Sequence, residues 1–334
     1  MVLFAWLIYI PLQILWLPLS IIGGLRVAYK QIWVSRKLGL SQTAVAVVNQ
    51  RWIADVFGLR QDAPSRLLAG KLPNNSVSGM RLLLFPLLAA RAIAGKPILY
   101  PLLPDDNKVG IAGLIFCRSA RFNSVIAAGV ADVAQFVVLG AGFDTRAYGP
   151  LSKQGLAMFE LDQAANQRVK REAVKRAGLG GDHVNYIEVD FAQPQWIKSL
   201  TGSSYDPSLK SIFLWEGVTL YLSEPDVRAT LAVIKANAAA GNVLLLDLYA
   251  TRFLAIARGG AAGKTLGATG EGMRFGLDFS GNPEGVLEDF ASSVGFDLGR
   301  RYFPGSAHKK GAYMVVAEFI VGRRSVPAHS AAPA

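Results

Sequence analysis

From Gln135 onward, short apolar runs alternate with helical stretches, and this alternation constrains the fold more than any other feature of the chain. Runs of this length and composition are typical of strands that are buried on both faces. They cover residues 136–139, 156–161, 184–189, 211–215, 242–248 and 312–321. Strands that alternate with helices form βαβ units. The chain is therefore predicted to be an α/β protein with a parallel sheet covered by helices.

Four of the predicted strands end in a glycine or an acid, namely Gly140, Asp162, Asp190 and Glu216. Ligands of open α/β sheets bind beyond the carboxyl ends of the strands, so these positions are predicted to share one site. Each acid also has a structural explanation. Asp162 and Asp190 can cap the helices that follow them. Glu216 needs a partner at a buried strand end, and either Arg146 or a ligand ammonium group can supply it.

The loop Gly140-Ala141-Gly142 follows a predicted strand and lets a ligand approach the backbone closely. Asp162 stands 22 residues after Gly140, where an acid accepts hydrogen bonds from ribose hydroxyls. The third glycine of the dinucleotide fingerprint is missing, and Asp144 places a negative charge where a pyrophosphate binds. A ligand with a sulfonium and no phosphate suits this loop better. The loop therefore favours S-adenosylmethionine as the cofactor, with an NAD-dependent oxidoreductase as the alternative.

Five motifs between Val109 and Tyr249 resemble the leucine carboxyl methyltransferase-like family, including its bacterial branch of S-adenosylmethionine-dependent methyltransferases. The motifs are Arg118-Ser119-Ala120-Arg121-Phe122, Leu139-Gly140-Ala141-Gly142-Phe143-Asp144-Thr145-Arg146, Phe159-Glu160-Leu161-Asp162-Gln163, Val189-Asp190-Phe191 and Glu216-Gly217-Val218-Thr219-Leu220-Tyr221-Leu222. The resemblance implies a class I methyltransferase fold. In that fold a Rossmann-like sheet has seven strands, and the last strand is antiparallel.

The resemblance also implies roles for these residues. Asp162 would bind the ribose of S-adenosylmethionine, and Asp190 with Phe191 would bind its adenine. Arg118 would pair with the methionine carboxylate, and Glu216 would lie near the ammonium group. The predicted cofactor site as a whole comprises Arg118, Gly140, Ala141, Gly142, Asp144, Asp162, Asp190, Phe191, Glu216 and Gly217.

Methyl transfer to an oxygen, often that of a carboxylate, is the reaction that the resemblance implies. A carboxylate is already charged, so positioning it in line with the methyl group carries most of the effect. Arg121, Arg146 and Arg274 are candidates to hold it. A hydroxyl acceptor would need a general base, for which Tyr221 is a candidate. Asn123-Ser124 stands where this branch usually has an acid, and the chain before Val109 does not match the soluble members of the family. Because N-terminal segments often shape the acceptor site, the motifs do not assign the acceptor.

The first 25 residues contain no charged side chain, and a helix of this length can cross the hydrocarbon core. Arg26 and Lys30 follow this apolar run, which places the rest of the chain on the cytoplasmic side and the N-terminus outside. Pro11 and Pro18 bend a helix, so an anchor within one leaflet and a helix buried in the protein are the alternatives. An anchor indicates a hydrophobic or membrane-associated acceptor. A membrane-anchored module without catalytic activity is the further alternative to an enzyme.

The positive charge of the chain is concentrated in its N-terminal third. Residues 1–121 contain 14 Lys or Arg and 4 Asp or Glu, whereas residues 122–334 contain 21 and 20. This asymmetry favours an anionic membrane surface, because no nucleic-acid-binding motif accompanies it. One cysteine and three histidines form no recognisable metal motif. Neither a nucleic acid nor a metal is therefore predicted as a partner.

These features together predict four regions. They are a transmembrane or monotopic anchor over 1–25, a basic helical cap over 26–108, a cofactor-binding domain over 109–324 with a lid insertion at 251–283, and a disordered tail over 325–334. Helices are expected over 41–72, 109–129, 163–177 and 225–240. A second apolar stretch over 77–103 is interrupted by Arg81, Arg91 and Lys96. It is predicted as an amphipathic or core-packed helix rather than a second membrane span.

Overall fold

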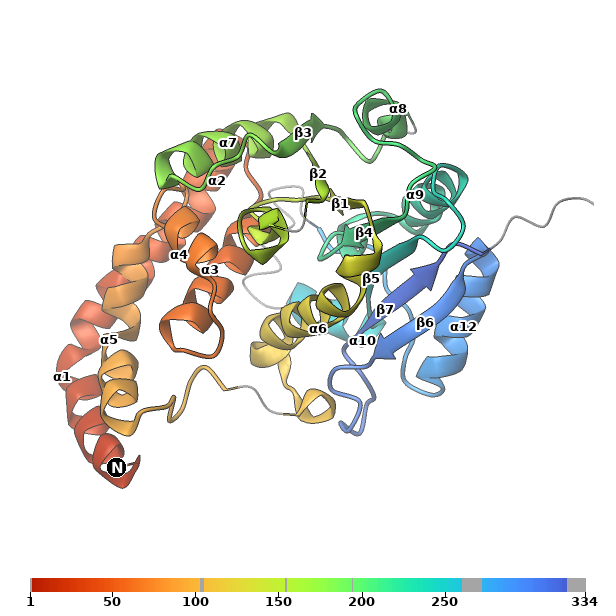
Figure 1. The fold of residues 1–334 in the computed structure, drawn as a ribbon. Coiled ribbons are helices and arrows are strands. Elements are labelled where there is room, and N and C mark those ends of the chain that lie inside the picture. Colours follow the sequence, from red (N-terminus) through yellow and green to blue (C-terminus); the bar gives the residue numbers. More distant parts are fainter. Residues whose placement is uncertain (1, 103–104, 154, 194, 260–271, 323–334) are drawn as a thin grey trace, which may run out of the picture.

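The centre of the protein is a seven-stranded sheet, seen in a computed structural model that describes residues 2–102, 105–153, 155–193, 195–259 and 272–322 (Figure 1). The strand order is β3-β2-β1-β4-β5-β7-β6. The bounds are β1 (Gln135–Leu139), β2 (Ala157–Asp162), β3 (Val184–Glu188), β4 (Ser211–Trp215), β5 (Val243–Tyr249), β6 (Asp297–Tyr302) and β7 (Met314–Ile320). β1 to β5 pair in parallel, whereas β7 runs antiparallel to both β5 and β6. The predicted α/β sheet of seven strands with an antiparallel last strand is confirmed.

Helices cover both faces of the sheet, because successive residues of a strand point to opposite sides. Phe136 and Val138 of β1 pack in one apolar cluster, and Val137 and Leu139 pack in the other. The first cluster includes residues of α6 (Leu114–Gly129), α7 (Ala164–Ala177) and α10 (Thr251–Gly259). The second includes residues of α8 (Trp196–Thr201), α9 (Glu224–Ala236) and α12 (Pro283–Val294). Burial on both faces explains why the central strands β1, β2, β4, β5 and β7 read as mainly apolar runs.

Two elements differ from the sequence prediction for clear physical reasons. β6 was not predicted, because it is an edge strand that pairs only with β7 and its polar residues are mostly exposed. The single helix expected over 41–72 is two helices, α3 (Gln42–Val56) and α4 (Ala63–Ala69). Gly58 lies between them with a φ of 71°, which is the left-handed region and ends the first helix.

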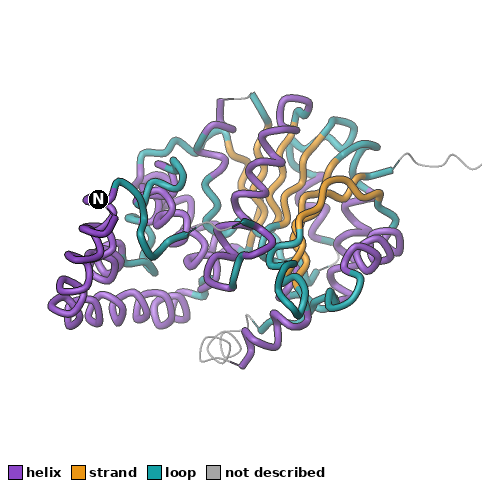
Figure 2. The backbone as a smooth tube through the Cα atoms, turned by 90° about the horizontal axis from the view of Figure 1, so that it is seen from below, coloured by secondary structure: helices purple, strands orange, loops and turns teal. Residues whose placement is uncertain are grey.

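The N-terminal segment forms one long helical element. α1 (Val2–Tyr29) continues through a π-helical turn, η1 (Lys30–Val34), into α2 (Ser35–Leu38), so the helix extends well beyond residue 25. α1 lies side by side with α5 (Val77–Ala94) along one flank of the molecule, and α3 and α4 lie between α5 and the sheet (Figures 1 and 2). By length and composition, the stretches Val2–Leu38, Val77–Ala94 and Ile111–Asp132 could each cross a membrane. The third of these contains α6, which packs in the core of the domain.

Candidate functional site

A cavity of about 760 Å³ opens at the carboxyl ends of the parallel strands. All ten residues of the predicted cofactor site line it, and so does Tyr221. The remaining wall comes from elements far apart in the sequence. It includes most of the residues between Ser35 and Val47 in the α2–α3 region, Ile111 just before α6, Leu114 at its start, Phe253 of α10, and Met273 and Arg274. The strand-end rule therefore brought the predicted residues to one place.

The loop after β1 depends on its two glycines. Gly140 and Gly142 have φ values of 68° and 46°, which side chains rarely adopt. A Cβ atom on Gly140 would lie 2.5 Å from Cγ2 of Val218, and one on Gly142 would lie 2.9 Å from Cβ of Ala44. The loop thus runs close to the chain on two sides and leaves no room for side chains at these positions.

Asp162 ties this loop to the start of α7. Its carboxylate accepts hydrogen bonds from the backbone N–H groups of Gly142 at 2.5 Å and Gln163 at 2.7 Å, and from Nδ2 of Asn166 at 2.8 Å. The N-cap of α7 is Gln163. Asp162 therefore does not occupy the helix-cap position that was the structural alternative to a role in ligand binding. A buried carboxylate that faces the cavity and organises the glycine loop is suited to bind a sugar hydroxyl.

Asp190 and Phe191 follow β3 on the same side of the cavity. Oδ1 of Asp190 accepts a hydrogen bond from the backbone N–H of Ala192 at 3.0 Å, and the side chain is exposed. The ring of Phe191 packs edge-on against Trp196, with 5.2 Å between the ring centroids. α8 begins only at Trp196, so Asp190 does not cap it either. The pair offers a hydrogen-bond acceptor beside an aromatic ring, which suits a heterocyclic base.

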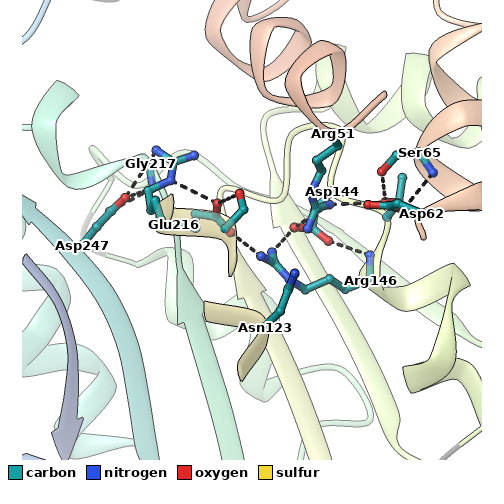
Figure 3. Close-up of polar contacts among 12 residues, drawn as sticks. Arg51, Asp62, Ser65, Asn123, Asp144, Arg146, Glu216, Gly217 and Asp247 are labelled. Atoms are coloured by element: carbon teal, nitrogen blue, oxygen red, sulfur yellow. Dashed lines mark hydrogen bonds and ion pairs between the residues drawn. The ribbon is translucent and has the colours of Figure 1, made fainter. Parts of the chain in front are cut away.

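A chain of buried ion pairs runs beside the cavity (Figure 3). Glu216 pairs with Nε of Arg118 at 3.1 Å and with Nη2 of Arg146 at 2.7 Å. Arg146 also pairs with Asp144, which in turn lies 3.4 Å from Nη1 of Arg51. Burial raises the pKa of Glu216, but the charges of Arg146 and Arg118 outweigh it and hold this pKa at about 2. The network therefore keeps Glu216 ionised at the edge of the cavity.

The other end of the network reaches β5. Arg118 donates a hydrogen bond to the hydroxyl of Tyr249 at 2.6 Å and lies 3.5 Å from Oδ2 of Asp247. Asp247 also accepts from the backbone N–H of Gly217 at 2.9 Å. Burial raises the pKa of Asp247 to about 6, although Arg118 opposes this shift. The turn after β4 is thus anchored on β5 through a carboxylate that was not among the predicted site residues.

Two of the three predicted catalytic residues lie away from the cavity wall. Arg146 is buried between Asp144 and Glu216 and does not line the cavity, so it is not free to hold an acceptor. Arg121 pairs with Asp106, and its guanidinium lies 4.8 Å from the centroid of the Tyr302 ring. It also does not line the cavity, because it stands one turn further along α6 than Arg118. Both positions correct the expectation that these arginines face the acceptor.

Asp144 does not oppose a dinucleotide in the way that the sequence suggested. Arg146 and Arg51 neutralise this carboxylate, so it does not present an unopposed negative charge to a ligand. The structure supplies a different reason. Between β1 and β2 the described residues contain only the short 3-10 turns η5 (Arg146–Tyr148) and η6 (Pro150–Lys153), and no α-helix. A dinucleotide places its pyrophosphate on a helix N-terminus, which this loop lacks.

Arg51, Asp247 and Tyr249 belong to the site but were not predicted from the sequence. One signal for Asp247 was present, since a charged residue interrupts an otherwise apolar strand there and a buried carboxylate needs a partner. Arg51 gave no comparable signal, because a basic residue in a helix usually points to solvent. Of the predicted lid, Phe253, Met273 and Arg274 line the cavity, and residues 260–271 lie outside the described part of the chain.

Acidification should destabilise the protein through Glu216. Its pKa is about 2 in the folded protein and 4.5 in the unfolded chain, so the unfolded chain takes up the proton first. The contribution of Glu216, roughly 3 kcal/mol, is therefore fully present above pH ~4.5 and is lost as the pH falls towards 2. Urea unfolding at pH 6 and pH 3 measures this loss. The same pH change should cost the Glu216→Gln variant less, and an equal loss in both proteins would assign the effect to other carboxylates.

Comparison with known proteins gives a consistent picture. A family model described as leucine carboxyl methyltransferase matches residues 101–235. A relative from Streptomyces avermitilis is 30% identical over 204 residues, which are 58% of this chain and 64% of that protein. YktD of Bacillus subtilis is 27% identical over 158 residues, which are 45% of this chain and 48% of that protein. Both relatives carry the name "Putative S-adenosyl-L-methionine-dependent methyltransferase".

Among solved structures, a DUF574 family protein from Streptomyces avermitilis has a TM-score of 0.47 at 14% identity and covers 63% of this chain and 84% of that one. The matched region thus spans less than two thirds of the length of the relatives compared by sequence. The family match confirms the predicted resemblance to the leucine carboxyl methyltransferases. The names of the relatives give the same class of enzyme and the same cofactor as the sequence predicted.

Proposed function

We propose that this protein is an S-adenosylmethionine-dependent O-methyltransferase that acts on the carboxylate of a hydrophobic or membrane-associated small molecule. The observation that carries the proposal is the composition of the cavity wall. Glycines and acids at the strand ends form one part of it, and apolar side chains contribute much of the rest. These apolar residues include Leu40, Val47, Leu114, Leu220, Leu222, Phe253, Met273 and Met314. A ligand that is part nucleoside and part apolar acid matches such a wall.

The residues around the glycine loop fit S-adenosylmethionine. Asp162 lies at the end of β2 with its carboxylate on the loop, and Asp190 with Phe191 lies at the next strand end. Close passage of the loop backbone requires glycine at Gly140 and Gly142. When bound, this cofactor supplies an electrophilic methyl group on a sulfonium. The protein's own task is to hold the cofactor and the acceptor in line and to exclude water.

The absence of a histidine base among the described lining residues favours a carboxylate over a hydroxyl acceptor. Nε2 of His183 lies 2.7 Å from the backbone carbonyl of Ala147, and Nε2 of His308 lies 3.0 Å from that of Val109. Neither histidine lines the cavity. A carboxylate acceptor is already ionised at neutral pH and needs no proton removal. Tyr221 would then orient the acceptor rather than deprotonate it.

Arg274 is the candidate to hold the acceptor carboxylate. The described residues of the wall include three cationic side chains, which are Arg36, Arg118 and Arg274. Arg118 is committed to Glu216 and Asp247. The backbone N–H of Arg274 donates to the carbonyl of Leu220 at 2.6 Å, which fixes it next to Tyr221. Its side chain is exposed, so its guanidinium can bind an incoming carboxylate.

Replacing Arg274 by glutamine should raise KM for a carboxylate acceptor about 10-fold to 100-fold, because one charge-assisted hydrogen bond is worth roughly 1.5–3 kcal/mol. Binding of S-adenosylhomocysteine should change little. The measurement is transfer of a radiolabelled methyl group to a panel of straight-chain fatty acids, with the matching fatty alcohols as a second panel. Arg36→Gln is the matched control on the opposite part of the wall. A larger effect of Arg36→Gln would move the acceptor site to that side, and methylation of alcohols alone would overturn the carboxylate assignment.

The cofactor assignment has a separate test. S-adenosylhomocysteine at 100 times its dissociation constant should stabilise the protein by about 2.7 kcal/mol and raise its melting temperature, whereas NAD should not. Stabilisation by NAD alone would favour the oxidoreductase. Cofactor binding without methyl transfer to any acid or alcohol would favour a non-catalytic module.

We further propose that α1 attaches the protein to a membrane with the cofactor-binding domain on the cytoplasmic side.

A further inference from the structure

The orientation of α1 follows from the way α5 is held. Just before the start of α5, Nδ2 of Asn74 donates to the hydroxyl of Ser35 at 2.9 Å. Near its end, Nε of Arg91 donates to the backbone carbonyl of Phe57 at 2.8 Å. Because Ser35 lies on α2, the first of these contacts ties α5 to the N-terminal helical element. Nδ2 of Asn75 also donates to the backbone carbonyl of Ala69, the last residue of α4, at 2.9 Å. Both ends of α5 are therefore held by α3 and α4, which pack in the core of the domain. A helix that crossed a bilayer would have its ends on opposite sides, so α5 does not cross one in this structure.

α1 packs antiparallel along α5. Nε1 of Trp16 donates to the carbonyl of Leu82 at 3.0 Å, and Nζ of Lys30 donates to that of Pro73 at 3.0 Å. Between these contacts the two helices touch at small residues. A Cβ atom on Gly23 would lie 2.6 Å from the backbone oxygen of Gly79. Backbone contact of this kind fixes α1 to α5 at a definite register.

Because the helices are antiparallel, Arg91 lies level with the part of α1 that precedes Trp16. If α1 stood upright in a bilayer, the contact between Arg91 and Phe57 would be carried into the hydrocarbon core. The polar loop that follows Phe57, with Arg60 and Asp62, would go with it. Charged loops are not tolerated there. The packing of α1 on α5 is thus incompatible with an upright α1.

The face of α1 turned away from α5 is apolar and exposed. Leu25 stands about 200° around the helix from Gly23. Ile14, which is 11 residues before Leu25, and Leu7, which is 7 residues before Ile14, share its face. These three side chains are 64%, 68% and 67% exposed, for Leu7, Ile14 and Leu25 respectively. The same flank exposes Phe4, Leu15, Ile22 and, on α5, Phe85. Exposed apolar side chains gathered along one flank of a helix mark a contact with a membrane or a partner.

We propose that α1 lies in the plane of a membrane, within the interface of one leaflet that contains anionic lipids. Charge complementarity favours lipid over a protein partner, since Arg26, Arg36 and Lys37 belong to the same helical element, Arg81 belongs to α5, and all four are exposed. Residues 1–54 contain no acidic side chain, which favours anionic headgroups further. The proposal refines the membrane attachment proposed above and does not depend on methyl transfer. It places the part of the cavity wall that comes from α2 and the start of α3, which follow α1 and η1, beside the membrane.

The test compares the depth of three positions on the exposed face. Leu7→Cys, Ile14→Cys and Leu25→Cys are made singly in a full-length Cys117→Ser background and labelled with an environment-sensitive fluorophore. Each protein is bound to vesicles of phosphatidylcholine and phosphatidylglycerol that contain lipids brominated at defined depths. Leu7 and Leu25 are separated by about 27 Å along the helix axis. An in-plane helix should give three depths within about 5 Å of one another, and each should lie near the headgroup boundary.

Ser280→Cys, which replaces an exposed residue distant from α1 in the sequence, is the control and should report water with or without vesicles. Depths that increase steadily from Leu25 towards Leu7, passing through the bilayer centre, would overturn the proposal in favour of a spanning helix. Protein that ignores the vesicles and forms a stable dimer in solution would assign the apolar face to a second copy of the chain. Replacing phosphatidylglycerol by phosphatidylcholine should weaken binding at least 10-fold, because each basic residue near the surface contributes about 1 kcal/mol.

Discussion

Replacing Asp162 by alanine should weaken the binding of S-adenosylhomocysteine about 100-fold. A carboxylate has about four acceptor sites, and Gly142, Gln163 and Asn166 use three of them. The remaining site is on Oδ2 of a residue that lines the cavity, and it suits a ribose hydroxyl. A hydrogen bond to a charged group is worth roughly 1.5–3 kcal/mol, and the variant also releases the N–H of Gly142. Isothermal titration calorimetry measures the change in the dissociation constant.

Asp289→Ala is the matched control, because Asp289 is an exposed acid on α12 and does not line the cavity. It should bind S-adenosylhomocysteine as the unaltered protein does. Circular dichroism should show that Asp162→Ala keeps its secondary structure. Affinity within threefold of the unaltered protein would remove Asp162 from the ribose site. Failure of the unaltered protein itself to bind would instead reject the cofactor, so the two failures are distinguishable.

Replacing Glu216 by alanine should lower the free energy of unfolding by about 3–5 kcal/mol. Arg118 and Arg146 are both buried and both pair with this carboxylate. Its removal leaves two desolvated guanidinium groups with too little negative charge nearby. The hydroxyl of Ser119 also loses its acceptor, which lies 3.0 Å away. The measurement is urea unfolding at pH 7, followed by circular dichroism.

The control for this variant is Glu188→Ala, at the exposed end of β3, which should change the free energy of unfolding by no more than about 0.5 kcal/mol. Glu216→Gln keeps the shape of the side chain and should fall between the two. A loss below about 1 kcal/mol for Glu216→Ala would mean that Asp144 and Asp247 compensate the arginines without Glu216. In that case the network would be a looser arrangement than the contacts indicate.

Much of the sheet and most of the cofactor site could be predicted, and the reasons are local. Strands buried on both faces are apolar over most of their length, so β1, β2, β4 and β5 are visible as runs. Residues that end parallel strands meet at one edge of the sheet, so Gly140, Asp162, Asp190 and Glu216 could be placed together from their positions in the sequence. β6 was not predicted, because an edge strand with polar residues does not form an apolar run.

The arginines show where such local patterns stop being informative. Arg118, Arg121 and Arg146 look alike in the sequence, yet only Arg118 lines the cavity. Arg146 is buried between Asp144 and Glu216, and Arg121 pairs with Asp106. An arginine side chain is long and flexible, so its position depends on where it can pair with an acid in a buried environment. Whether such an acid lies within reach depends on how α6, the glycine loop and β4 pack together, and the spacing of residues in the sequence does not show this.

The glycine loop and the apolar N-terminus show the same difference between what the sequence determines and what only the tertiary structure determines. The sequence by itself determined that the chain builds a parallel sheet, that a tight glycine turn follows its first strand, and that its first 25 residues carry no charged side chain. These properties follow from backbone sterics and burial, which act residue by residue. Only the tertiary structure decided which charges are neutralised and how α1 is oriented. Asp144 is neutralised by Arg51 from a distant helix, and α1 packs along α5, whose two ends are held by α4 and by the end of α3. Charge pairing and helix orientation depend on distances between elements far apart in the chain, and folding alone sets those distances.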